Sequence, residues 1–210
     1  MGTGGADTGV SDPAAGAIVG LYRRHAGAFD RLRARSLIER AWLDRFLDLA
    51  EAEANLLDIG CGSGEPIARY LIERGHAVTG VDSSAELIAL CRARFPTREW
   101  IVADMRDLAL GRRFGGVLAW NSFFHLTAEA QRAMFAAFAD HTAPGAPLMF
   151  TSGTAAGEAI GEFEGEPLFH ASLDTADYAA LLDTHGFDVV EHRIDDAACG
   201  GATVWLARRR

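Results

Sequence analysis

The segment that most constrains this chain is 56–66, LLDIGCGSGEP, where a short apolar run breaks into glycines at alternate positions. The apolar run is typical of a buried parallel strand, and the glycines let the backbone turn sharply and approach a ligand that any Cβ would block. Pro66 has no N–H to leave unpaired, which suits the first turn of a helix. The segment therefore predicts a strand, a ligand-binding turn and a helix in succession.

The spacing of these glycines separates two classes of cofactor site. In a dinucleotide-binding fingerprint, glycines occupy the first, third and sixth positions, which here are Gly60, Gly62 and position 65. Position 65 is a glutamate. A nicotinamide-dependent oxidoreductase is therefore disfavoured and is kept as an alternative.

Short β-rich runs alternate with helical stretches from residue 54 onward. The expected strands are 54–59, 76–81, 99–103, 116–120 and 147–151, and the expected helices are 65–74, 84–94, 128–141 and 175–184. This alternation predicts a parallel sheet with helices on both faces. Two final strands, 187–193 and 203–207, have Gly200 and Gly201 between them and predict a terminal hairpin with an antiparallel last strand.

Three later strands also end in chemically informative residues. The second strand ends at Asp82, the third is followed by Asp104 and Met105, and the fourth is followed by Asn121 and the segment 122–125. Together with the glycine segment, these elements resemble in order and spacing the motifs of the class I S-adenosylmethionine-dependent methyltransferases. The resemblance covers about residues 15–208. It implies an α/β fold with a single Rossmann-like, doubly wound sheet of seven mostly parallel strands in the order 3-2-1-4-5-7-6, the last strand antiparallel.

The resemblance also implies a cofactor, S-adenosylmethionine, and a division of its binding among the strand ends. Asp82 would accept hydrogen bonds from the ribose hydroxyls, Asp104 would take the adenine amine with Met105 against the ring, and the backbone of 60–62 would approach the methionine moiety. The candidate cofactor residues are Tyr22, Asp58, Gly60, Cys61, Gly62, Gly64, Asp82, Ser83, Asp104, Met105 and Asn121.

Methyl transfer is an in-line displacement, so rate comes chiefly from holding the nucleophile aligned in a dry chamber, and a base helps when the nucleophile must lose a proton. The candidate catalytic residues are His125, Asn121 and His170. His125 is the first candidate base, and the alternative for it is a packed histidine with a backbone partner. Asn121 stands where the family often has an acid, and an amide cannot accept a proton. The candidate substrate-binding residues are Phe123, Phe124, His125, Phe163 and His170.

The length of 210 residues suits one domain, expected over 11–210. Residues 11–50 predict a helical cap of two helices, the second over 36–50, and residues 1–10 a flexible tail. The acidic segment 152–172 carries aromatic residues and has no place in the sheet. It is interpreted as a lid-like insertion or, alternatively, as a solvated loop.

The composition excludes several classes of partner and cofactor. The net charge of −9 repels nucleic acid, and no apolar run is long enough for a bilayer, so neither a nucleic acid nor a membrane partner is expected. All 20 basic residues are Arg, which excludes a lysine Schiff base with pyridoxal phosphate and a phosphate-loop lysine. Three widely spaced cysteines fit free thiols in a reducing cytoplasm, and no metal-ligand spacing is present, so no metal is predicted.

The sequence therefore predicts a cytoplasmic methyltransferase, monomeric or homodimeric, that methylates O or N of a small molecule. Besides the oxidoreductase, the alternative is a non-catalytic S-adenosylmethionine-binding scaffold, since Asn121 replaces an acid.

Overall fold

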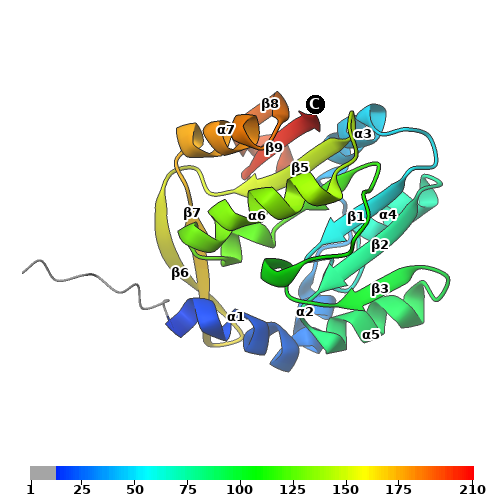
Figure 1. The fold of residues 1–210 in the computed structure, drawn as a ribbon. Coiled ribbons are helices and arrows are strands. Elements are labelled where there is room, and N and C mark those ends of the chain that lie inside the picture. The colour runs from blue at the N-terminus through cyan, green and yellow to red at the C-terminus, as the bar shows by residue number, and fades with distance from the viewer. Residues whose placement is uncertain (1–12) are drawn as a thin grey trace, which may run out of the picture.

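The computed structural model describes residues 13–210, so the tail predicted at 1–10 lies outside the described residues. Its centre is a seven-stranded sheet with the order β3-β2-β1-β4-β5-β9-β8 (Figure 1). Neighbours among β1 to β5 pair in parallel, and β9 is antiparallel to both β5 and β8. Counted by sheet strands alone, this is the order 3-2-1-4-5-7-6, which confirms the predicted fold class.

The predicted strands and helices of the sheet layers are all present, with bounds that shift by a few residues. The sheet strands are β1 Asn55–Ile59, β2 Ala77–Asp82, β3 Glu99–Val102, β4 Val117–Ala119, β5 Pro147–Ser152, β8 Phe187–Asp196 and β9 Ala202–Arg209. The helices are α1 Pro13–Arg24, α2 Ala26–Leu32, α3 Arg40–Leu49, α4 Ile67–Glu73, α5 Ala85–Arg94, α6 Ala128–His141 and α7 Thr175–Thr184, with short 3-10 helices η1 Met105–Asp107, η2 Phe123–His125 and η3 Ala197–Cys199. None of the helices within 13–210 is long and apolar enough to cross a bilayer.

Helices cover both faces of the sheet. On one face α3, α4 and α5 enclose a core that includes Phe46, Leu71 and Leu56. On the other face α6 and α7 enclose a core that includes Phe135 and Leu57. The adjacent β1 residues Leu56 and Leu57 point to opposite faces because side chains alternate along a strand. Burial on both faces explains why β1 is a continuous apolar run in the sequence.

The helix predicted over 36–50 belongs to the sheet layers and not to a cap. It begins at Arg40 as α3, and it buries Trp42, Leu43 and Phe46 in the core beside the sheet. The observed cap therefore consists of α1 and α2, which meet at His25. Apolar spacing identified the helix correctly, but the spacing does not tell which surface the apolar side covers.

Two side-chain caps hold helix starts at the carboxyl edge of the sheet. Ser84, just after β2, accepts a hydrogen bond from the N–H of Leu87 at 3.2 Å, and Thr127, just after η2, accepts one from Ala130 at 3.3 Å. Such a cap typically stabilises a helix start by about 1 kcal/mol. The starts of α5 and α6 are thereby held close to the strand ends that form the site.

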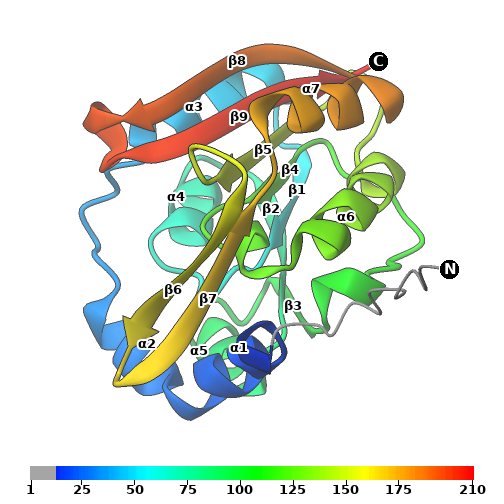
Figure 2. The ribbon, with the colours of Figure 1, turned by 90° about the vertical axis from the view of Figure 1, so that its left-hand side faces the viewer.

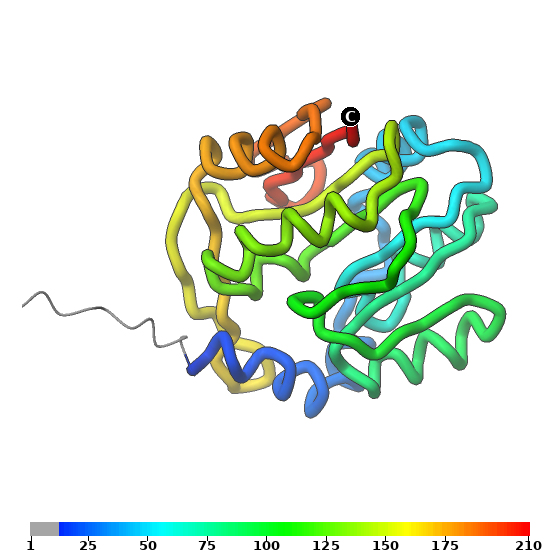
Figure 3. Tube along the Cα trace, in the orientation of Figure 1, coloured from blue at the N-terminus to red at the C-terminus, as the bar shows by residue number. Residues whose placement is uncertain are grey.

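The segment 152–172 forms a β-hairpin outside the main sheet. Its strands, β6 Gly157–Phe163 and β7 Glu166–Ser172, pair antiparallel. Figure 2 shows the hairpin extending from the end of β5 to α1, and the trace in Figure 3 follows the same path. β6 is exposed along almost its whole length, whereas β7 buries Phe169 and Ala171. The sequence analysis missed these strands because β6 has no buried face and hence no alternating apolar pattern.

Candidate active site

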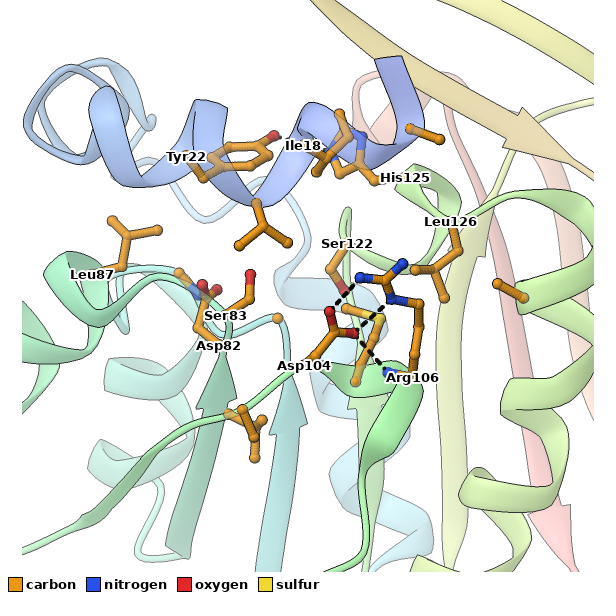
Figure 4. A pocket seen from close by; sticks show the side chains of 18 of the residues that line it. Ile18, Tyr22, Asp82, Ser83, Leu87, Asp104, Arg106, Ser122, His125 and Leu126 are labelled. Carbon is orange, nitrogen blue, oxygen red and sulfur yellow. Dashed lines mark hydrogen bonds and ion pairs between the residues drawn. The ribbon is translucent and has the colours of Figure 1, made fainter. Parts of the chain in front are cut away.

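A cavity of about 200 Å³ lies at the carboxyl ends of β1 to β4, under α1; we call it the first cavity (Figure 4). Ile18 and Tyr22 of α1 lie above it, and Asp82 and Asp104 lie below. Ligands of open parallel sheets bind outside this edge. The predicted cofactor residues Gly60, Gly62, Ser83, Met105 and Asn121 also line this cavity.

The turn at 60–62 presents bare main chain to the cavity. Gly60 and Gly62 have φ angles of +75° and +56°, which favour glycine. A Cβ at Gly60 would overlap the side chain of Ser122, and a Cβ at Gly62 would lie 2.9 Å from the ring of Phe29. Gly64, in contrast, packs toward Phe95 and lines none of the three cavities described here. Gly64 therefore faces Phe95 and Cys91 of the neighbouring segment, away from these cavities.

Asp82 lies in the first cavity with both carboxylate oxygens tied to the main chain. Oδ2 accepts the N–H of Gly62 at 2.9 Å, and Oδ1 accepts the N–H of Ser84 at 2.9 Å. Burial raises the pKa of Asp82, and these backbone donors act in the opposite direction. Each carboxylate oxygen has a further lone pair. Asp82 is thus oriented to accept a further hydrogen bond from a ligand.

Asp104 is already bound to a neighbouring side chain. Arg106 donates from Nε to Oδ1 at 2.9 Å and from Nη2 to Oδ2 at 2.6 Å, and its N–H donates to Oδ1 at 2.9 Å (Figure 4). This pairing holds the pKa of Asp104 below its usual range. An adenine amine would have to share the carboxylate with Arg106. The sequence analysis missed Arg106, although its position two residues after Asp104 was a usable signal.

Two more cavities adjoin the first. The second, of about 260 Å³, lies between the α2–α3 connection and the ends of β5 and β9. The third, of about 230 Å³, lies beside Asp58 and Cys61. Of the predicted substrate residues, Phe124 lines the second and third, His125 the first and third, and His170 the third.

Asn121 lines all three cavities. Its φ is +48°, its N–H donates to Thr151 Oγ1 at 2.8 Å, and the Thr151 hydroxyl donates to Asn121 Oδ1 at 3.3 Å. Because Thr151 holds the carbonyl end of the amide, the Nδ2 end is left for a ligand. Asn121 therefore stands where the three cavities meet, with an N–H donor available.

Asp58 is a buried carboxylate at the third cavity, only 3% exposed. Burial and then the charge of Asp82 raise its pKa to about 7, while Arg33 acts in the opposite direction. Within residues 13–210 its carboxylate accepts no hydrogen bond, and a buried charge without partners is costly. The site therefore favours a ligand with a cationic, hydrogen-bond-donating group at Asp58.

His125 is buried and paired at both ring nitrogens. Nδ1 lies 2.8 Å from the carbonyl oxygen of Phe169, and Nε2 lies 2.9 Å from the hydroxyl of Tyr22. Burial lowers the pKa of His125 to about 4 and raises the pKa of Tyr22 to about 12, so both are neutral near pH 7. His125 therefore has the backbone partner of the alternative interpretation at Nδ1, and it has a side-chain partner, Tyr22, at Nε2.

Two predicted substrate residues lie elsewhere. Phe123 has no exposed surface and packs in the core against Phe135 and Phe150, so its assignment to the substrate wall is wrong. Its neighbour Phe124 points to the cavities because successive residues of the short η2 turn face different ways. Phe163 stacks on Tyr22 with ring centroids 6.1 Å apart, and it lines none of the three cavities.

The sequence analysis also missed an ion pair in the second cavity. Arg33 donates from Nη2 to Glu39 Oε1 at 2.6 Å, and Glu39 is 1% exposed. Both residues line the second cavity. They lie in the irregular connection between α2 and α3, where no periodic pattern marks a buried charge.

Comparison with known proteins agrees with this geometry. The family model of a methyltransferase domain matches residues 56–145. A dTDP-3-amino-3,6-dideoxy-alpha-D-glucopyranose N,N-dimethyltransferase of Streptomyces fradiae is 39% identical over 93 residues, which are 43% of this chain and 36% of the relative. A malonyl-[acyl-carrier protein] O-methyltransferase of Pectobacterium atrosepticum is 34% identical over 96 residues, 45% of this chain and 36% of the relative. The chain thus aligns with little more than a third of these curated relatives.

Solved structures match over nearly the whole chain. DesVI of Streptomyces venezuelae has a TM-score of 0.69 at 19% identity and covers 89% of this chain and 98% of its own. The 1,6-didemethyltoxoflavin-N1-methyltransferase of Burkholderia thailandensis has a TM-score of 0.71 at 20% identity, covering 97% and 93%. Residues 56–145 are therefore similar to a methyltransferase domain, and the chain has the fold of these methyltransferase structures.

Proposed function

We propose that this protein transfers the methyl group of S-adenosylmethionine to oxygen or nitrogen of a small molecule. The observation that carries the proposal is the arrangement of a bare glycine turn, Asp82 and the unpaired Asp58 around connected cavities. The family match at 56–145 and relatives named as N- and O-methyltransferases support it.

The cavities fit the parts of this cofactor. Adenosine would occupy the first cavity, with the ribose hydroxyls at Asp82 and the adenine near Asp104, Met105 and Leu126. The methionine moiety would lie along the turn at 60–62 with its ammonium group toward Asp58. When bound, the cofactor supplies a methyl group on a positively charged sulfur. This placement brings the methyl group near Asn121, at the junction of the cavities.

The protein's contribution to rate would be position and exclusion of water. Holding a nucleophile in line at contact distance can lower a barrier by roughly 7 to 11 kcal/mol. Here α1 covers the first cavity from above, and the β6–β7 hairpin reaches the same helix (Figure 2). We propose that α1 and this hairpin act as the lid of the chamber.

The acceptor would be a compact small molecule. The second cavity, of about 260 Å³, and the side of the third cavity lined by Phe124, His125 and His170 are available to it. The net charge of −9 disfavours a nucleic acid substrate. Amino sugar nucleotides are a reasonable first panel, because relatives are named for them. Three buried free cysteines fit a reducing cytoplasm, where the protein would act as a monomer or homodimer.

The test has two parts. Calorimetry should show S-adenosylhomocysteine binding, and reduced nicotinamide dinucleotides should not compete with it. The protein should then move label from methyl-labelled S-adenosylmethionine into a product in a metabolite extract. Binding of the nicotinamide instead would favour the oxidoreductase, and binding without any labelled product would favour the inert scaffold.

A further inference from the structure

The Tyr22–His125 pair offers a route for the proton that the acceptor must lose. We propose that Tyr22 takes this proton from the acceptor while passing its own hydroxyl proton to Nε2 of His125, and that β7 holds His125 in the tautomer that this relay requires. The inference rests on the proposed methyl transfer. In this relay Tyr22 is the catalytic residue that contacts the acceptor, and His125 acts only through Tyr22, by accepting its proton.

Tyr22 is placed to touch the reacting groups. It lines both the first cavity and the third, so it borders the space assigned to the cofactor and the space available to the acceptor. Its ring is held between Phe29, at a centroid distance of 5.4 Å, and Phe163, at 6.1 Å. Figure 4 shows Tyr22 above Asp82, with its hydroxyl toward His125. His125 itself is only 7% exposed, which leaves Tyr22 as the accessible member of the pair.

The tautomer follows from the two hydrogen bonds of His125. The carbonyl oxygen of Phe169 accepts only, so the proton of the neutral imidazole must lie on Nδ1, 2.8 Å away. Nε2 then carries the lone pair and accepts the Tyr22 hydroxyl at 2.9 Å. With its own proton directed at His125, the Tyr22 oxygen has a lone pair free for an acceptor N–H or O–H.

The step balances without another reactant. The acceptor's nitrogen or oxygen bonds to the methyl carbon as the carbon–sulfur bond breaks, and that electron pair stays on sulfur. The acceptor's proton moves to the Tyr22 oxygen, and the Tyr22 proton moves to Nε2, which leaves a neutral tyrosine and an imidazolium. The imidazolium still donates from Nδ1 to Phe169, and it returns the extra proton to water after product leaves.

The charged and titratable groups around the pair come from three elements. Asp82 of β2 faces Tyr22, and burial and then the charge of Asp82 raise the pKa of Tyr22. His170 of β7 lies with its ring centroid 4.8 Å from that of His125 and lowers the pKa of His125, as burial does more strongly. Arg24, the last residue of α1, and His25, which follows it, pair with Glu166 of β7. These last contacts hold β7 on the helix that carries Tyr22, so both partners of His125 are fixed together.

The relay is tested first by histidine ¹⁵N NMR with S-adenosylhomocysteine present, which needs no acceptor. His125, assigned through His125→Gln, should show the Nδ1–H tautomer, and Tyr22→Phe should shift its Nε2 resonance toward that of a free lone pair. The matched control Tyr70→Phe, on α4, should leave it unchanged. An Nε2–H tautomer, or an Nε2 resonance that does not shift in Tyr22→Phe, would overturn the relay.

The second readout is initial rate with labelled S-adenosylmethionine and the metabolite extract. Tyr22→Phe and His125→Gln should each lower the rate about 100-fold or more, and the double variant should be no slower than the slower single variant. Affinity for S-adenosylhomocysteine should change by less than about threefold, and His76→Gln serves as the control for a buried histidine. The wild-type rate should be flat from about pH 6 to 8, whereas the variants should speed up with pH because hydroxide must then take the proton, or the acceptor must lose it before attack.

The outcomes separate the relay from the proposed function. A wild-type protein that neither binds S-adenosylhomocysteine nor transfers label refutes the proposed function. A wild-type protein that does both, while Tyr22→Phe keeps the wild-type rate and pH profile, refutes the relay alone.

Discussion

The N–H of Gly62 donates a hydrogen bond of 2.9 Å to Oδ2 of Asp82, 20 positions further along the chain. Parallel pairing of β1 with β2 brings the two strand ends together. The bond connects the glycine turn to the acid expected to hold the ribose. Asp82 therefore shapes the turn as well as offering its own oxygens.

Replacing Asp82 should weaken cofactor binding strongly. Asp82→Ala removes hydrogen bonds to a charged group that contribute about 1.5–3 kcal/mol each, so the Kd for S-adenosylhomocysteine should rise at least 10-fold. Calorimetry measures it, with Asp140→Ala, an exposed acid on α6, as the control. Equal affinity of Asp82→Ala and wild type would refute the assignment of this strand end.

The adjacent residues Phe123 and Phe124 should respond in opposite ways. Phe123→Ala opens a cavity in the core and should lower the free energy of unfolding by about 3–5 kcal/mol. Phe124→Ala, at the second and third cavities, should cost less stability and should raise the KM for the acceptor. Urea unfolding and initial rates test the pair. Similar stability losses for both variants would argue against this division of roles.

Asp58 should make stability depend on pH. Its pKa is raised to about 7 in the folded protein, mainly by burial, whereas an unfolded chain has about 3.9. Between these values the folded state binds more protons, so the free energy of unfolding should fall as pH rises from about 4 to about 7. Asp58→Asn has no proton to lose and should flatten this fall. Parallel unfolding profiles for variant and wild type would contradict the predicted role of Asp58.

Docking of the hairpin on α1 should depend on Glu166. Glu166→Gln removes the charge that pairs with Arg24 and His25, so amide hydrogens of β6 and β7 should exchange faster while those of the main sheet stay unchanged. Glu162→Gln, an exposed acid on β6, is the matched control. Exchange by mass spectrometry measures the effect. If the amides of β6 and β7 exchanged at the same rate in both variants, the pairs that Glu166 makes with Arg24 and His25 would not hold the hairpin in place.

Sequence reasoning succeeded where a motif follows a strand. Asp82, Asp104 and Asn121 lie where their strands predict, because parallel strands deliver their carboxyl ends to one edge. It failed where adjacent residues point in different directions, as with Phe123, which lies in the core, and Phe124, which lies at the cavities. It also failed for Arg33 and Glu39, which pair in an irregular connection.

The sequence by itself determined the succession of strands and helices, the glycine turn and the acids at the strand ends, because these depend on local pattern. The order of the strands in the sheet followed from the resemblance to a known family. Only the tertiary structure decided which groups meet across long separations. Tyr22 reaches His125 across 103 positions, and the carbonyl of Phe169 that sets the tautomer of His125 belongs to a hairpin with no buried face on β6. Such contacts arise from packing between separate elements, and no spacing along the chain encodes them.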